Sequence, residues 1–218
     1  MTLKVLFIPS RKEDFIDKKE LASIASKLPS RICLISSVQY LHLIYSIAEE
    51  LKKNKKHVLV AGQVLGCNAR EAEKLKNKVD CFLLLASGKF HALPVALNTG
   101  KKVYVWHPNA VLESIDENEI EILKKKRKAA MLNFLSSEKI GILVSLKPGQ
   151  EKLKEAFKIK KTLEKKNKSA YIFIADTINL QELENFSIDS WVNTACPGIA
   201  LHSANIVNID EINSITGL

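Results

Sequence analysis

Two cysteines in different parts of the chain stand where a thiol could do chemistry. Cys67 closes a glycine-containing loop, residues 62–67, after an apolar run at 57–61 that is typical of a buried strand. Cys196 also stands where a predicted strand gives way to a loop. Open α/β sheets bind their ligands at the carboxyl ends of strands. These two residues are therefore the first candidates for a metal or catalytic site.

The other two cysteines, Cys33 and Cys81, are interpreted as core residues. Cys33 lies in the middle of a predicted strand and Cys81 at the start of another, where cysteine packs as a small apolar residue. The same packing role is the alternative for Cys67 and Cys196. No Cys-x-x-Cys run is present, so a metal site requires separate loops that converge, as sites between domains do.

His91 has the clearest functional placement among the histidines. The sequence GKFH at 88–91 leads from a predicted strand into a helix that we expect to begin near Ala92. Backbone amides at a helix start suit an anionic group, and His91 could donate a hydrogen bond beside them. The alternative is that His91 caps the helix.

Strands and helices alternate along the chain, which predicts mostly parallel sheets with covering helices. Apolar runs predict strands at 3–8, 31–36, 57–61, 79–86, 102–106 and 139–145. Helices are predicted at 38–53 and 69–76, with a turn and helix at 88–97. Asp17 and Glu20 form a capping-box pattern that opens a further helix.

The second half of the chain repeats the first. Residues 31–37 can be laid on 139–145, and residues 79–82 fall on 188–191 with nearly the same offset. Each unit ends in a strand and a helix that an aspartate opens. The start of the chain has the same ending pattern, with no unit before it.

The repeat predicts the domain organisation. We expect an α/β fold of two repeated parallel-sheet domains, at 30–137 with Cys67 and at 138–218 with Cys196. Residues 1–29 are expected to be the strand and helix that end a first domain, whose body is missing.

Composition limits the class of protein. The chain has 218 residues and 46% apolar content, enough for a sizeable core. Its apolar runs are too short to span a bilayer, and no signal peptide is recognisable, so we expect a cytoplasmic protein without membrane contact. The net charge of +9 comes from lysines on the solvent faces of helices, without the series of interleaved aromatic residues that a base-stacking platform requires. We therefore expect no direct nucleic-acid binding.

Five sequence motifs, in this order, resemble one family: SVQY (37–40), GQVLGC (62–67), GKFH (88–91), KPGQ (147–150) and WVNTACP (191–197). Together they resemble the diphthamide synthesis enzymes, 2-(3-amino-3-carboxypropyl)histidine synthases of archaea and eukaryotes. The resemblance runs from about Val5 to the C-terminus.

The resemblance implies a chemistry. Members of this family have three similar α/β domains, each of which gives one cysteine to a [4Fe-4S] cluster, and they work as dimers. The cluster cleaves the Cγ–S bond of S-adenosylmethionine, and the 3-amino-3-carboxypropyl radical attacks a histidine of translation elongation factor 2. By motif, Cys67 and Cys196 correspond to cluster ligands, and we expect Gln63, Gly88 and His91 to bind S-adenosylmethionine.

Two features depart from the family pattern. The first domain and its cysteine are absent, so we expect a separate polypeptide to supply them in a homo- or hetero-oligomer. Gly198 follows Pro197, where the family usually has arginine. Two alternatives therefore stay open: a non-catalytic scaffold or electron-delivery subunit of this enzyme, and a binding module without a cluster.

Overall fold

The computed structural model contains two compact units, Met1–Ile120 and Glu121–Leu218. It describes residues 6, 8–13, 16–66, 68–108, 111–201 and 203–216, with side chains as far as residue 212. Each unit has its own sheet and its own apolar cores. The predicted α/β class with two parallel-dominated sheets is confirmed.

The first unit is built on a five-stranded sheet in the order β2-β1-β3-β4-β5. The strands are Arg31–Ser36 (β1), His57–Gln63 (β2), Cys81–Leu85 (β3), Lys102–Trp106 (β4) and Glu113–Ser114 (β5). β1 to β4 are parallel, and β5 is antiparallel to β4. The sequence did not predict β5, because a two-residue strand is too short to show a periodic pattern.

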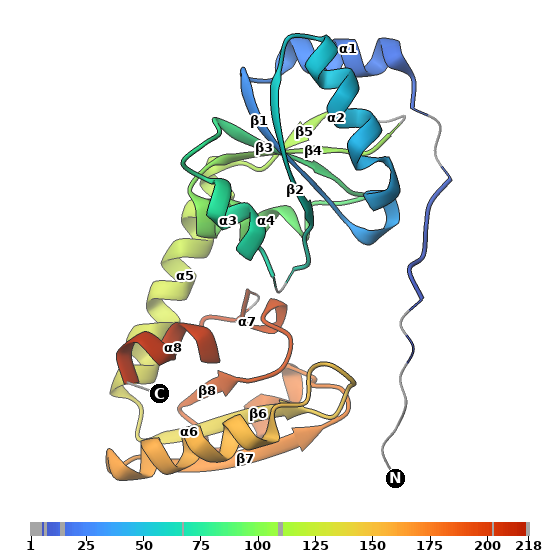
Figure 1. Ribbon diagram of the computed structural model, residues 1–218. Coiled ribbons are helices and arrows are strands. Elements are labelled where there is room, and N and C mark those ends of the chain that lie inside the picture. The colour runs from blue at the N-terminus through green and yellow to red at the C-terminus, as the bar shows by residue number, and fades with distance from the viewer. Residues whose placement is uncertain are drawn as a thin grey trace. The chain divides into compact units, whose positions relative to one another are not determined.

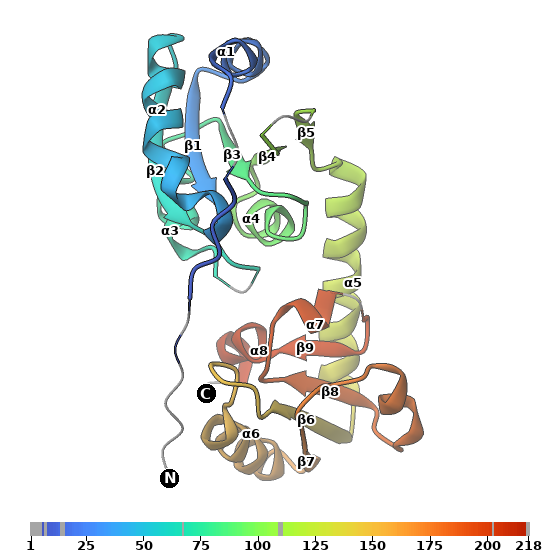
Figure 2. The ribbon, with the colours of Figure 1, turned by 90° about the vertical axis from the view of Figure 1, so that its right-hand side faces the viewer.

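Helices cover both faces of this sheet (Figure 1, Figure 2). They are α1 (Lys18–Lys27), the 3₁₀ helix η1 (Val38–Leu43), α2 (Ile44–Lys53), α3 (Arg70–Leu75) and α4 (Ala92–Thr99). On one face, Leu21 of α1 and Ile47 of α2 pack with Leu34 of β1. On the other face, Val95 of α4 belongs to the same core as Ile35. Neighbouring residues of β1 therefore enter different cores, which is the two-residue period of a strand.

The second unit has a four-stranded parallel sheet in the order β7-β6-β8-β9. The strands are Lys139–Ser145 (β6), Ser169–Ala175 (β7), Ser190–Asn193 (β8) and Ile206–Asn208 (β9). The helices are α5 (Glu117–Ser136), which crosses the boundary between the units, α6 (Leu153–Lys165), the 3₁₀ helix η2 (Gln181–Asn185), α7 (Gly198–Leu201) and α8 (Ile209–Thr216). Phe134, Ile159 and Ile212, from α5, α6 and α8, share one core.

The two sheets share one topology. β6, β7, β8 and β9 occupy the places of β1, β2, β3 and β4, as the internal repeat predicts. An aspartate makes an equivalent hydrogen bond in both units, to the first residue of β1 and of β6. Asp80 accepts the backbone N–H of Arg31 at 3.1 Å, and Asp189 accepts that of Lys139 at 2.7 Å. The predicted match of residues 79–82 with 188–191 thus corresponds to a shared structural contact.

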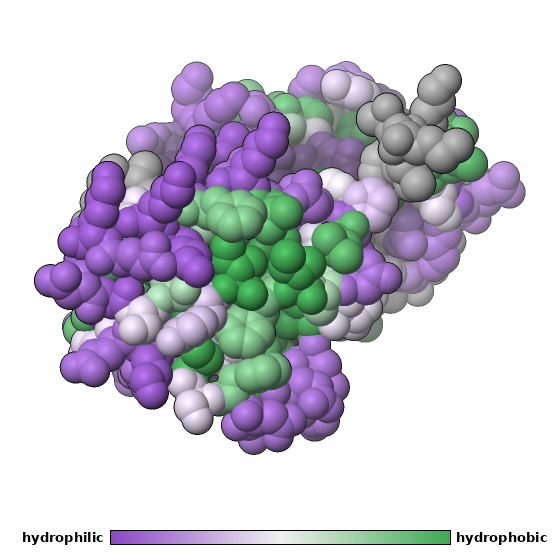
Figure 3. All heavy atoms as spheres, turned by 90° about the horizontal axis from the view of Figure 1, so that it is seen from below, coloured by the Kyte–Doolittle hydropathy of each residue, from purple (hydrophilic) through white to green (hydrophobic). Residues whose placement is uncertain are grey.

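The second sheet has one thinly covered side. Between β7 and β8 the chain forms only η2 and loops, where the first unit has α3. Seen from below, apolar residues gather on the second unit (Figure 3). Its edge strand β7 exposes one apolar residue on each face of the sheet, Tyr171 (48% exposed) and Ile174 (50% exposed). Exposed apolar side chains on an unpaired strand edge favour association with other chains.

The start of the chain differs from the prediction. Of the strand expected at 3–8, the described residues Leu6 and Ile8 are not in a strand and are 82% and 80% exposed. A strand needs a hydrogen-bonded neighbour, and neither residue pairs with the first sheet. The helix after Asp17 is confirmed, because the Asp17 side chain accepts the N–H of Lys19 at 2.9 Å. Glu20 accepts a hydrogen bond from the Trp106 indole, so it ties α1 to β4.

Within the described ranges, every helix is too short or too polar to cross a lipid bilayer.

Candidate functional site

The carboxyl ends of β1, β2 and β3 meet at one edge of the first sheet. Ser36 at the end of β1 pairs with Gln63 on one side and with Leu85 on the other. β2 and β3 lie on opposite sides of β1, so the edge contains the switch point where parallel α/β sheets bind ligands. The stretches that carry Gln63, Gly88 and His91 leave from this edge.

The structure places these three candidate residues as follows. Gln63 is exposed at the end of β2. Gly88 is exposed, and a Cβ built on it would meet no atom within 4 Å. His91 is partly buried at the N-cap position of α4, and its side chain makes no capping hydrogen bond. Its buried Nδ1 has no hydrogen-bond partner in the described part of the chain.

The amides at the start of α4 do not fit the anion site that we expected there. The N–H groups of Ala92 and Leu93 both donate to the carbonyl of Lys89, at 2.9 and 3.3 Å. The next residue, Pro94, has no N–H to offer. The sequence could not show that a local turn already satisfies these donors. His91 itself stays a candidate ligand residue.

The protonation of His91 should make stability depend on pH. Burial lowers its pKa below the ordinary value, so the folded protein favours the neutral ring. The stability that the neutral His91 ring contributes is therefore complete above its unfolded pKa of about 6.5. This stability is lost as the pH falls below that value. When the pH is lowered from about 7.5 to about 5, we expect the free energy of unfolding to fall less for His91→Gln than for the parent chain. Urea unfolding at both pH values measures this, and equal losses would contradict it.

Further polar residues at this edge were not assigned a role from the sequence. The Lys12 ammonium lies 3.0 Å from His107 Nε2, and the Lys12 N–H donates to the Gln39 carbonyl at 3.1 Å. Ser87 Oγ donates to Gln39 Oε1 at 3.4 Å. The buried Ser37 Oγ has no hydrogen-bond partner among the described residues. Except for Lys12, these residues lie within three positions after the end of β1, β3 or β4, and that placement could have identified them.

Cys67 lies outside the described residues, but its neighbours are described. The backbones of Leu65 and Asn68 exchange two hydrogen bonds, each of 3.1 Å. A Cβ on Gly66 would lie 2.3 Å from Cε1 of Phe90. A side chain at this position would therefore have to displace the Phe90 ring, which packs directly on the Gly66 backbone.

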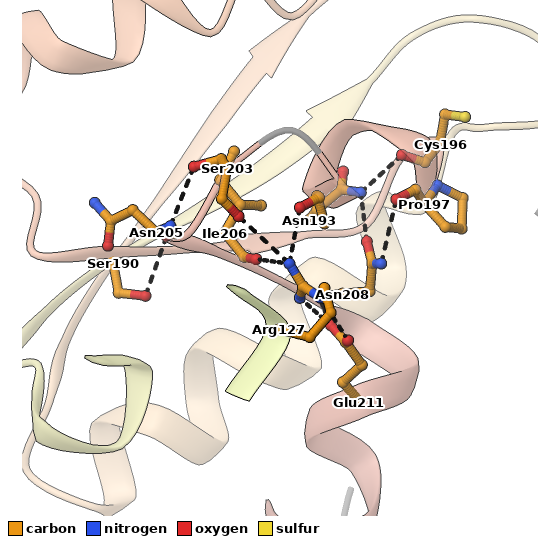
Figure 4. Close-up of polar contacts among 11 residues, drawn as sticks. Arg127, Ser190, Asn193, Cys196, Pro197, Ser203, Asn205, Ile206, Asn208 and Glu211 are labelled. Atoms are coloured by element: carbon orange, nitrogen blue, oxygen red, sulfur yellow. Dashed lines mark hydrogen bonds and ion pairs between the residues drawn. The ribbon is translucent and has the colours of Figure 1, made fainter. Parts of the chain in front are cut away.

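Cys196 lies in the second unit, after the end of β8 (Figure 4). The residue is partly exposed and its thiol is free. Asn193 Nδ2 donates to the Cys196 carbonyl at 2.8 Å, and Asn193 Oδ1 accepts the Ala195 N–H at 3.0 Å. Thr194 is buried and donates through both its N–H and its Oγ1 to the Leu143 carbonyl. Hydrogen bonds thus hold the loop around a partly exposed residue that carries a free thiol.

The two remaining cysteines are core residues, as predicted. Cys33 and Cys81 are fully buried, and burial raises the pKa of each thiol to about 12. A thiol must lose its proton to bind a metal, so neither residue is suited to be a ligand. Among the described residues no three histidine, cysteine or acidic side chains form a metal-binding group. Of the four cysteines, Cys67 and Cys196 stay the predicted metal ligands.

Comparison with known proteins identifies relatives for most of the chain. The family model of diphthamide synthesis proteins matches residues 1–206. The 2-(3-amino-3-carboxypropyl)histidine synthase of Pyrococcus horikoshii is 32% identical over 84% of this chain and 55% of its own length. The protein of the same name from Methanocaldococcus jannaschii is 25% identical over 91% of this chain and 56% of its own length.

A solved structure is similar as well. The crystal structure of Dph2 from Pyrococcus horikoshii with a 4Fe-4S cluster matches 91% of this chain with a TM-score of 0.74 and 30% identity. The match covers 60% of the Dph2 chain. The present chain thus spans little more than half the length of the relatives that it matches.

Proposed function

The chain belongs to the family of diphthamide synthesis proteins, and on this premise we propose that it is a component of a 3-amino-3-carboxypropyl transferase. The group is taken from S-adenosylmethionine and transferred to a histidine of translation elongation factor 2, the first step of diphthamide biosynthesis. The reaction takes place in the cytoplasm. The observation that carries the proposal is the free thiol of the partly exposed Cys196 in its firmly held loop.

Cys67 and Cys196 are proposed to hold a [4Fe-4S] cluster through their thiolates. When bound, the cluster supplies the electron that breaks the Cγ–S bond of S-adenosylmethionine. Thiolates are the usual ligands of such clusters, and the two other thiols are buried with a raised pKa. The structure of the Pyrococcus relative, which contains a 4Fe-4S cluster, supports this assignment.

Gln63, Gly88 and His91 are proposed to bind S-adenosylmethionine. The exposed Gln63 amide can both donate and accept hydrogen bonds to an amino-acid group. The open space at Gly88 allows a ligand to approach the backbone closely. His91 is neutral near pH 7 because burial lowers its pKa, so its free Nδ1 can make a hydrogen bond without adding charge.

A third thiolate is proposed to come from a domain outside these 218 residues. The relatives are almost twice as long as the part that matches, which leaves room for such a domain. We propose that a separate polypeptide carries it and joins this chain in an oligomer. Elongation factor 2 is the proposed protein substrate.

The proposal is tested by anaerobic reconstitution. The chain is purified alone and together with a candidate first-domain polypeptide from the same genome, and both samples are treated with iron and sulfide. We expect about four iron atoms per assembly and a reduced-state EPR signal only in the joint sample. Radical transfer to elongation factor 2 is then assayed in that sample. No iron in either sample would contradict the proposal and favour a non-catalytic subunit or a binding module.

A further inference from the structure

Two asparagine side chains hold the backbone on both sides of the Cys196 thiol. Asn193 Nδ2 donates both to the Cys196 carbonyl and to Asn208 Oδ1, each at 2.8 Å. Asn208 Nδ2 in turn donates to the Pro197 carbonyl at 3.3 Å. Both carbonyls therefore point into the unit, while the Cys196 sulfur points away from the asparagines (Figure 4).

Asn208 is itself fixed by an ion pair. Its backbone N–H donates to Glu211 Oε2 at 2.6 Å, and Arg127 binds both carboxylate oxygens of Glu211. The Arg127 side chain is only 13% exposed, and its Nη1 also donates to the carbonyls of Ala200 and Ile206, each at 2.8 Å. One guanidinium thus joins the end of α7, the start of β9 and the first turn of α8.

The hydrogen-bond network that begins at Arg127 ends at the loop that carries Cys196. A sheet of this topology requires neither an asparagine pair between the ends of β8 and β9 nor hydrogen bonds to Cys196 and Pro197. Asn193 is 1% exposed, and burying an amide costs free energy unless its groups are paired. Here its donor and acceptor groups are used on the loop and on Asn208. These hydrogen bonds therefore order the backbone next to the partly exposed Cys196.

We propose that Asn208, held by the Arg127–Glu211 pair, is a positioning residue that fixes the direction of the Cys196 thiol. This inference rests on the proposed role of Cys196 as a cluster ligand. A ligand supplied from separate segments must be held to within about 0.5 Å, because each segment contributes only one bond to the cluster. The Asn208 side chain provides this order before any metal is bound.

The test uses the metal-free 218-residue chain with Asn208→Ala. Loss of the Asn208 bonds frees Asn193 and loosens the loop. We expect hydrogen exchange at the Ala195 amide and iodoacetamide labelling of Cys196 to become roughly five- to tenfold faster. NMR measures the first rate and peptide mass spectrometry the second. Asn133→Ala is the matched control, because Asn133 also bonds two other segments of this unit but does not touch Cys196 or Pro197.

The outcomes separate positioning from general destabilisation. Unchanged rates in a folded Asn208→Ala chain, or the same acceleration in Asn133→Ala, would overturn the inference. If Asn208→Ala fails to fold, Asn208→Ser replaces it, because serine keeps a polar group at this site. Both rates are measured without iron, so they test positioning even if the proposed function fails. A failed reconstitution of the parent chain would instead count against the function alone.

Discussion

Replacing Cys196 with alanine is expected to reduce the iron content of the reconstituted assembly to background. The fold should persist, because Cys196 is partly exposed and the loop is held through backbone groups that alanine retains. We therefore expect the free energy of unfolding to change by less than about 0.5 kcal/mol. Iron analysis, the reduced-state EPR spectrum and urea unfolding of the same samples measure these effects. Cys67→Ala is expected to lose iron in the same way.

Cys33→Ala is the matched control for this prediction. Cys33 is fully buried in the core of the first unit, so its truncation should leave a small cavity. We expect normal iron content and a loss of about 1–2 kcal/mol in unfolding free energy. Iron retained by Cys196→Ala, or lost equally in Cys33→Ala, would show that cluster binding does not depend on the Cys196 thiol.

Gly141→Ala is expected to be the most destabilising single-methyl change in the second unit. Gly141 lies in β6 next to Trp191 of β8, and a Cβ there would lie 2.2 Å from Trp191 Cε3. The indole cannot easily move, because its ring packs edge-on against Phe173 and Phe186, at centroid distances of 4.8 and 6.2 Å. Overpacking of this kind costs roughly 2–3 kcal/mol. Urea unfolding followed by circular dichroism measures the loss.

A double-mutant cycle identifies the cause. Trp191→Leu removes the ring that a new methyl group would strike, so Gly141→Ala should cost much less in that background. We expect the double variant to be more stable than the sum of the single effects by at least about 1 kcal/mol. Additive effects would mean that the strand, rather than the indole, opposes the substitution.

Local patterns in the sequence predicted the secondary structure well. The strands at 31–36, 102–106 and 139–145 and the helix after Asp17 follow from apolar period and capping chemistry, which depend on neighbouring residues. The internal repeat predicted that both units have the same strand order, because two segments with the same apolar pattern bury the same faces of their strands. The burial of Cys33 and Cys81 also followed from their place in strands. The assignment of Cys67 and Cys196 to a cluster came from motif resemblance and stays a prediction.

The contacts that prepare the site were decided only by the tertiary structure. Arg127 and Glu211 are far apart in the sequence, and no periodic pattern links them or shows that they anchor Asn208. The packing of Phe90 on Gly66 depends on where two loops meet. The first two amides of α4 proved to be already satisfied by a local turn. Sequence by itself determined which residues lie in strands, helices and strand exits, because those preferences are local. Which side chains meet there depends on packing between distant segments, and only the folded chain settles that.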